Sequence, residues 1–180
     1  MRIVQAALSG VLEVAPRVFE DERGDFFETY RRSTMAEMGI NVEFVQENQS
    51  RSRRHVLRGM HYQIRHAQGK LVRVVAGEVF DVVVDLRRSS LTFAKWFGTR
   101  LSAQNRRMLW VPEGFAHGFL ALSEYADVLY KTTDYYAPEH ERCLRWDDST
   151  IGIAWPIEAA PLLSAKDAIG KSLREAECFG

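Results

Sequence analysis

The chain has 180 residues with 24 basic and 24 acidic side chains, so its formal net charge is zero, and 46% of its residues are hydrophobic. This length suits one domain with a substantial core, formed by residues 1–180. The balanced charge argues against non-specific binding to nucleic-acid phosphates. Only two cysteines occur and no apolar stretch approaches the ~20 residues of a membrane span, so we expect a cytoplasmic protein that binds no nucleic acid and no membrane.

The first predicted element is a short helix over 33–38, with Ser33 as its cap. Short strand-like runs, separated by turns such as Pro112-Glu113-Gly114, then predict strands over 56–63, 71–75, 79–86, 93–101, 107–112, 117–122 and 126–133, of which 79–86 is rich in β-branched residues. A second short helix is predicted at 164–168. Many short strands with few helices are typical of a β-sandwich or barrel. We favour an all-β double-sheet jelly roll with its ligand in the mouth, although periodicity alone does not separate it from other all-β sandwiches.

Two strand-forming stretches contain charged residues that need an explanation. Asp81 and Asp85 interrupt the apolar run 79–86 and, four residues apart, share one face of it. The basic run 51–54 admits two interpretations, an exposed loop or a position near an anionic ligand. Runs of like charge are usually surface, so the exposed loop is favoured.

Four residues form a set that can move a proton next to a carbonyl group: His61, Lys70, Tyr130 and Asp167. One group acts as base, a cation or donor holds the enolate oxygen, and an acid returns a proton. A lone histidine on a strand is more often structural. Here Arg58 and Lys70 bring further polar groups into the same stretch, and a buried cluster of that kind needs partners or a ligand. Arg58 and His61 differ by three positions and would face opposite sides of a regular strand, unless the intervening glycine marks a bulge.

Other classes of site find little support. The position two after His61 is Gln63, His66 lies in a polar stretch and His117 is distant, so no set of three or four metal ligands is evident and we expect no metal. No glycine-rich dinucleotide loop, phosphate loop or Gly-x-Ser-x-Gly occurs, which argues against nucleotide-dependent redox chemistry and serine hydrolysis.

Aromatic and charged residues gather in two further segments, which comprise Phe19, Arg23, Phe26, Phe27 and Glu28, and Tyr135, Tyr136, Glu141 and Arg142. The simpler interpretation is core aromatics with charges at the rim. The functional one is a platform that stacks a base while guanidinium groups hold phosphates.

The order and spacing of several segments give a more specific indication. They are Pro16–Phe19, Asp21–Gly24, Phe27-Glu28, Phe44–Asn48, Val56–Gln63, Gln68–Arg73, Gly77–Val82, Trp110–Phe119, Tyr130–Thr132 and Leu163–Asp167. Together they resemble the dTDP-4-dehydrorhamnose 3,5-epimerase family almost from end to end. The resemblance implies a cupin-type jelly roll, a homodimer, no cofactor, and conversion of dTDP-4-dehydro-6-deoxy-D-glucose into dTDP-4-dehydro-L-rhamnose in dTDP-L-rhamnose biosynthesis.

The resemblance also implies roles for individual residues. His61 resembles the base that takes the C3 and C5 protons, Asp167 its paired carboxylate, Lys70 the stabiliser of the enolate oxygen and Tyr130 the acid on the opposite face. Tyr136 resembles the residue that stacks on thymine. The other implied substrate contacts are Arg23, Glu28, Gln46, Glu47, Asn48, Arg58, Lys70, His117, Glu141 and Lys166, of which Arg23, Arg58 and Lys166 are expected to act through the diphosphate.

The chain departs from the family pattern at three places. Glu47 and Gln49 stand where the family commonly has Asp and His, and Leu91 replaces a usual Pro. No expected proton-transfer residue is altered. Two alternatives stay open: an epimerase that inverts only C3 or only C5 of a deoxysugar, and a non-catalytic cupin that binds a sugar nucleotide. The presence of both His61 and Tyr130 argues against the second.

Overall fold

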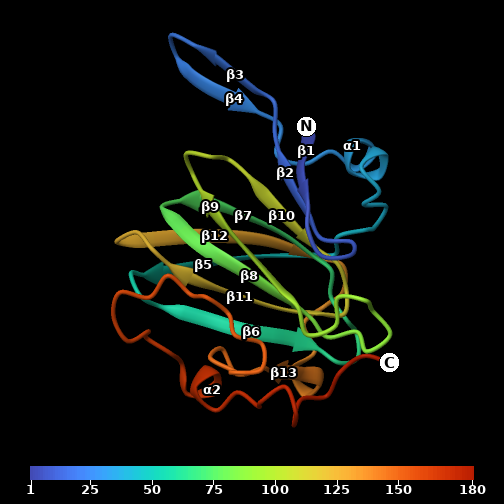
Figure 1. The fold of residues 1–180 in the computed structure, drawn as a ribbon. Helices are drawn as coiled ribbons and strands as arrows, with labels where there is room; N and C mark the ends of the chain where they lie inside the picture. The colour runs from blue at the N-terminus through green and yellow to red at the C-terminus, as the bar shows by residue number, and fades with distance from the viewer.

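Two antiparallel sheets face each other in the computed structural model, which describes residues 1–180 (Figure 1). One sheet has six strands, in the spatial order β1 (Arg2–Ala6), β2 (Leu12–Ala15), β10 (Met108–Val111), β7 (Lys70–Ala76), β12 (Tyr125–Thr132) and β5 (Gln46–Arg53). The other has five, in the order β13 (Glu141–Cys143), β6 (Leu57–Gln63), β11 (Phe115–Ala121), β8 (Glu78–Asp85) and β9 (Trp96–Ser102). The expected all-β double-sheet jelly roll is confirmed.

The main core lies between the sheets, because successive residues of a strand point to opposite faces. Val72 and Val74 of β7 belong to the apolar cluster that fills this space, whereas Leu71 packs in a second cluster on the outer face. The same division holds in β10, where Leu109 points inward and Met108 outward. Both faces of β10 are therefore buried, which explains why its sequence is continuously apolar.

Irregular segments and two short helices cover the outer faces. Met35 of α1 (Arg32–Glu37) and Ile40 close the outer face of the six-stranded sheet. The C-terminal segment, which contains α2 (Ala165–Ala168), runs beneath the five-stranded sheet, where Leu144 and Ala176 pack against it (Figure 1). Neither α-helix has the length and apolar character needed to cross a membrane.

The hairpin of β3 (Val18–Asp21) and β4 (Gly24–Phe27) projects away from both sheets (Figure 1). Arg106 holds the hairpin, because its guanidinium pairs with Asp25 and lies over the Phe27 ring. The cross-strand pair of Phe19 and Phe26 has no cover, since Phe19 is 52% exposed and Phe26 is 71% exposed.

All seven strands predicted from residue 56 onward are present as β6 to β12. The strand expected to begin at residue 93 begins at Trp96 instead. The chain first turns around the buried carboxylate of Asp85, which accepts hydrogen bonds from the hydroxyl groups of Ser90 and Thr92. Both predicted helices occur, but the cap expected at Ser33 is wrong, because the first helix begins at Arg32 and has no side-chain cap.

The exposed loop predicted over 51–54 is also wrong. Arg51 and Arg53 lie in β5, which pairs along its whole length with β12. The Arg51 guanidinium donates two hydrogen bonds to the carboxylate of Asp127 on that neighbouring strand, at 2.8 and 2.7 Å. The sequence did not reveal the strand, because the inward residues of β5 are polar and give no alternation of apolar and polar residues.

Candidate active site

A cavity opens between the two sheets, and most of the predicted site residues line it. It consists of two adjoining hollows of about 270 and 310 Å³ that share five lining residues. The predicted residues that line the cavity are Gln46, Asn48, Arg58, His61, Lys70, His117, Tyr130, Tyr136, Glu141, Lys166 and Asp167. Residues far apart in the sequence thus meet because alternate positions of several strands point into the same interior.

A bulge in β6 explains why Arg58 and His61 line one cavity. In the pairing with β11, His61 lies opposite His117 and Arg58 lies opposite Phe119, so three steps on β6 match two on β11. The extra residue reverses the alternation between the two side chains. Gly59 makes this possible, because its φ of 134° and its approach to Gly118 exclude a side chain: an added Cβ would lie 2.6 Å from the Gly118 Cα.

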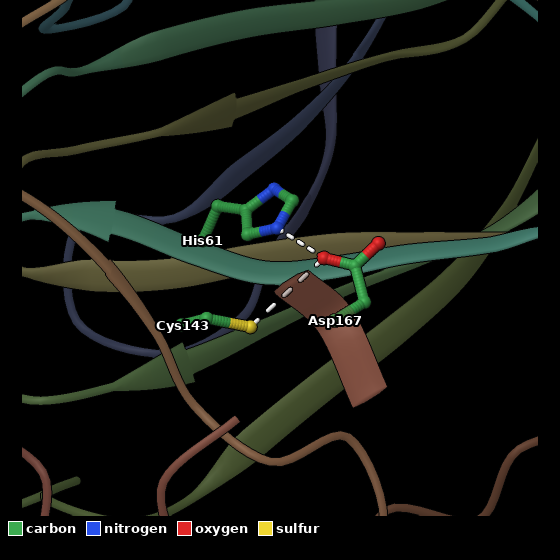
Figure 2. A group of neighbouring side chains, drawn as sticks. All are labelled: His61, Cys143 and Asp167. Atoms are coloured by element: carbon green, nitrogen blue, oxygen red, sulfur yellow. Dashed lines mark hydrogen bonds and ion pairs between the residues drawn. The ribbon is translucent and has the colours of Figure 1, made fainter. Parts of the chain in front are cut away.

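His61 and Asp167 form a hydrogen-bonded pair at the floor of the cavity (Figure 2). The His61 Nε2 lies 2.5 Å from the Asp167 Oδ1, so Nε2 carries the proton toward the carboxylate and Nδ1 is left with a lone pair. Burial alone would raise the pKa of Asp167, but the hydrogen bond and charge of His61 hold it below its ordinary value. Ser164 fixes the carboxylate in turn, because its Oγ accepts the Asp167 N–H at the start of α2.

Lys70 enters the cavity from the opposite sheet, at the start of β7. Burial lowers the pKa of Lys70 to about 8, although the negative charges of Glu141 and Asp81 favour the ammonium form. The ammonium is therefore held with few water contacts, which strengthens its attraction for a nearby anion. An oxygen that develops negative charge in this cavity would find a desolvated cation.

Tyr130 also comes from the six-stranded sheet and faces the histidine across the interior. Its inward neighbour along β12 is Val128 of the main core, and the ring packs against that core. Burial raises the pKa of Tyr130 above its ordinary value, so the phenol stays protonated near neutral pH. The His61 imidazole on β6 and the protonated Tyr130 phenol on β12 thus stand on opposite walls of one cavity.

A network of polar groups lies at the rim. The Glu141 carboxylate accepts hydrogen bonds from the Lys166 ammonium at 2.6 Å and from the Tyr136 hydroxyl at 2.7 Å. Burial would raise the pKa of Glu141, but Lys166 and Tyr136 lower it overall. Arg58 donates to the Ser52 hydroxyl and has no carboxylate partner. The rim therefore offers an unpaired guanidinium beside a rigidly held aromatic ring.

Three predicted contact residues are not brought to this cavity. Arg23 lies on the projecting hairpin and pairs with Asp21 at 2.6 Å. The Glu28 carboxylate pairs with Arg31 at the end of the same segment. Glu47 occupies an outward position of β5 and pairs with Lys131 at 2.7 Å, because the strand alternation that points Gln46 and Asn48 inward turns the residue between them outward.

Sequence reasoning missed two further polar residues of the cavity region. The buried Asp81 carboxylate lies 2.9 Å from the His117 Nε2, and its position within an apolar strand was the available signal. Ser50 lines the cavity with a buried hydroxyl that has no hydrogen-bond partner, and no pattern distinguished this serine from its neighbours. An unpaired hydroxyl in a ligand cavity is free to bind a ligand.

Gln63 holds the loop that carries Tyr136. Its side chain is 4% exposed. The amide nitrogen donates to the carbonyl groups of His66 and Tyr135, at 2.6 and 3.2 Å, and the amide oxygen accepts the Ala137 N–H at 2.9 Å. One buried amide thus joins two loops at the cavity mouth.

A separate hollow of about 330 Å³ lies away from these residues. Its charged groups are already neutralised by one another, because Arg54 pairs with Glu158 and Arg100 pairs with Glu78. It therefore lacks the unpaired polar groups of the inner cavity.

The fold and the site together define a jelly-roll protein whose interior cavity brings together an imidazole, an ammonium and a phenol. Residues 5–175 match the family model described as dTDP-4-dehydrorhamnose 3,5-epimerase. The chain belongs to this family.

Individual relatives agree with the family match. The chain is 59% identical over 180 residues to the dTDP-4-dehydrorhamnose 3,5-epimerase of Pseudomonas aeruginosa, and the match covers 99% of each chain. A crystal structure of dTDP-6-deoxy-D-glucose-3,5-epimerase from Legionella pneumophila in complex with dTDP-4-keto-L-rhamnose matches with a TM-score of 0.95 and 46% identity, covering 98% of this chain and 94% of that one. A 3'-monoepimerase from Streptomyces bikiniensis in complex with dTDP-quinovose matches with a TM-score of 0.88 and 33% identity, covering 94% and 86%.

We predict that Gln63→Leu destabilises the fold by about 1–3 kcal/mol, because three backbone groups lose their partner in the buried Gln63 amide. Urea unfolding followed by circular dichroism measures the change. Gln68→Leu is the matched control, since Gln68 makes one amide hydrogen bond, to the Asp134 carbonyl, and should cost less. Equal stability of the Gln63→Leu variant and the unsubstituted protein would show that the Gln63 amide does not stabilise the two loops.

Proposed function

We propose that this protein is a dTDP-4-dehydrorhamnose 3,5-epimerase that acts on dTDP-4-dehydro-6-deoxy-D-glucose and yields dTDP-4-dehydro-L-rhamnose. The observation that carries the proposal is the placement of His61 and Tyr130 on opposite sheets of one cavity. Inversion needs a proton removed from one face of a carbon and returned to the other. We further propose that residues 1–180 act as one domain, in the cytoplasm, where both unpaired cysteines would stay reduced.

In this mechanism His61 removes the protons of C3 and C5 in turn. Both carbons flank the C4 ketone, so loss of either proton gives an enolate with its charge on the carbonyl oxygen. The hydrogen bond from Nε2 to Asp167 leaves Nδ1 as the nitrogen that accepts the proton. The carboxylate then stabilises the imidazolium that forms, as in other histidine–carboxylate pairs.

Lys70 and Tyr130 complete each inversion. The Lys70 ammonium would hold the enolate oxygen, and one such donor in a desolvated site typically contributes about 2.7–4 kcal/mol of transition-state stabilisation. The Tyr130 phenol would return a proton from the opposite wall. Its pKa is raised by burial, so the phenol is present as an acid throughout the neutral range.

The rim residues fit the nucleotide end of the substrate. Arg58 and Lys166 supply cationic donors for the diphosphate oxygens. Tyr136 offers an aromatic face for the thymine ring, and its hydroxyl is fixed by Glu141. Gln46 steadies the same loop, because its amide oxygen accepts the Tyr136 N–H at 3.1 Å.

A single-site epimerase is the second candidate. The observation in its favour is the close match to the 3'-monoepimerase from Streptomyces bikiniensis, since the fold is shared by enzymes of both kinds. Product NMR in deuterated water separates the two. Deuterium at both C3 and C5 supports double inversion, and deuterium at one carbon supports the alternative.

We predict that His61→Ala abolishes both epimerisation and exchange of the C3 and C5 protons with solvent. Tyr130→Phe removes only the hydroxyl, so enolate formation continues while delivery to the opposite face fails. The Tyr130→Phe variant should exchange the C3 and C5 protons of the substrate for deuterium with retention of configuration, and it should form little inverted product. Each loss should reach ~10²–10⁴-fold.

NMR of the recovered substrate and product measures both rates for the two variants. Circular dichroism checks that each variant is folded. Normal inversion by Tyr130→Phe, or equal exchange by the two variants, would show that the division of roles is wrong.

We predict that kcat/KM falls as pH rises through about 8. The lowered pKa of Lys70 means that its ammonium is present below that pH and is lost above it. Lys70→Gln should flatten this alkaline limb and reduce kcat by ~10²–10³. Tyr130→Phe should keep the alkaline fall in kcat/KM, because burial raises the pKa of Tyr130 and its phenol does not lose a proton near pH 8. An unchanged alkaline limb in Lys70→Gln would assign it to another group.

We also propose a homodimer in which the β3–β4 hairpin reaches the cavity of a second copy. The hairpin projects from its own chain with two exposed phenylalanines. The side chain of Arg23 at its tip is 85% exposed and far in the fold from the cavity that the other predicted residues line. A second copy would cover the aromatic surface and bring this guanidinium to a diphosphate.

A complementation experiment tests this arrangement. Arg23→Ala should weaken dTDP binding by about 1.5–3 kcal/mol if the contact is charge-assisted. The Arg23→Ala variant is then mixed with the His61→Ala variant under conditions that exchange subunits. Activity should be restored, because one site of the mixed dimer contains both Arg23 and His61. Exchange confirmed by mass, with no activity regained, would contradict the proposal.

A further inference from the structure

A cysteine lies beside the proposed base pair. Cys143 pairs with His61 across β13 and β6, and its Sγ lies 4.0 Å from the Asp167 Oδ1. Figure 2 shows the carboxylate between the imidazole and the thiol. The thiol does not line the cavity, so the proposed chemistry makes no use of it.

The three side chains offer one donor atom each: imidazole nitrogen, thiol sulfur and carboxylate oxygen. These atoms all lie within 4.8 Å of one another. Tetrahedral zinc, with bonds of about 2.0–2.3 Å, separates its ligand atoms by roughly 3.3–3.7 Å. The nitrogen and oxygen lie 2.5 Å apart, the sulfur and oxygen 4.0 Å apart, and the nitrogen and sulfur at most 4.8 Å apart, so each distance needs a change of about 1 Å to match tetrahedral zinc.

The donor types select the kind of cation. A thiolate and an imidazole suit zinc and similar borderline-soft ions, whereas magnesium and calcium prefer sites made of oxygen. His61 and Asp167 line the hollow of about 310 Å³, so the donors are reached from the cavity and a water molecule can complete the coordination.

We propose that His61 Nε2, Cys143 Sγ and Asp167 Oδ1 form an inhibitory site for zinc. Its inhibitory effect rests on the proposed role of His61 as base, while the binding itself does not. Zinc on Nε2 displaces the proton of that nitrogen, and neutral imidazole then carries its proton on Nδ1. Cys143 releases its thiol proton to solvent, so one proton leaves the protein for each ion bound. Nδ1 no longer has a lone pair, and the base is switched off.

Cobalt(II) titration measures binding without reference to activity. The full chain should bind one equivalent with a sulfur-to-cobalt charge-transfer band in the near ultraviolet, and added zinc should remove the band. Cys143→Ala should lose the band, while Cys178→Ala should keep it as the matched control for the other thiol. Absence of the band in the unsubstituted protein overturns the site, whatever the enzyme's activity proves to be.

Inhibition is then measured by adding zinc during turnover and restoring activity with a chelator. Cys143→Ala should keep its activity in chelator and need at least about 100-fold more zinc for half-inhibition, beyond the ~10–100-fold effect of changing a neighbour that is not a ligand. Cys143→Ser is a second variant in case the first folds poorly. His66→Ala tests the stacked surface pair of His66 and His140, and its zinc sensitivity should not change. Equal zinc sensitivity in both Cys143 variants and the unsubstituted protein overturns the proposal.

Discussion

The alternation of side chains along facing strands is the constraint on which the site depends. Each strand contributes every second residue to the space between the sheets, and that space is apolar at one end and polar at the other. Along β7 the inward positions run from Lys70 to Val72 and Val74. Along β12 they run from Tyr130 to Val128. One strand thus supplies both a core residue and a cavity residue. The positions of Lys70 and Tyr130 are therefore fixed by core residues that lie only two positions away along the same strand.

The bulge at Gly59 is a local exception that adds a charge to the cavity. A regular β6 would send Arg58 to the outer face when His61 points inward. The close approach of Gly59 to Gly118 accommodates an extra residue, and both side chains then face the same ligand. Any side chain at either glycine would push the two central strands of this sheet apart. The packing of two glycines is therefore as important for the site as the groups that react.

Sequence reasoning predicted the apolar strands and much of the site for different reasons. β6 to β12 were found because short strand-like runs between turn residues give a local signal, which is strongest in the valine-rich β8. β5 was missed because its inward residues are Gln46, Asn48, Ser50 and Ser52, which serve a cavity and carry no apolar periodicity. The proton-transfer set was recognised by residue type and family spacing. The pairing of His61 with Asp167 joins positions 106 residues apart, so it was expected from the family resemblance and no local pattern indicated it.

Glu47 illustrates the limit of carrying a contact over by motif alone. Its neighbours Gln46 and Asn48 line the cavity, while Glu47 pairs with Lys131 on the outer face. A strand that pairs over eight residues cannot turn one residue inward without turning its neighbours outward. A contact between Glu47 and the substrate would therefore have to be made outside this cavity, whereas we propose that Arg23 on the hairpin reaches the cavity of a second copy. The outer face of β5 and the exposed hairpin are both available to a second copy of the chain, whereas the chemistry of proton transfer stays within one interior.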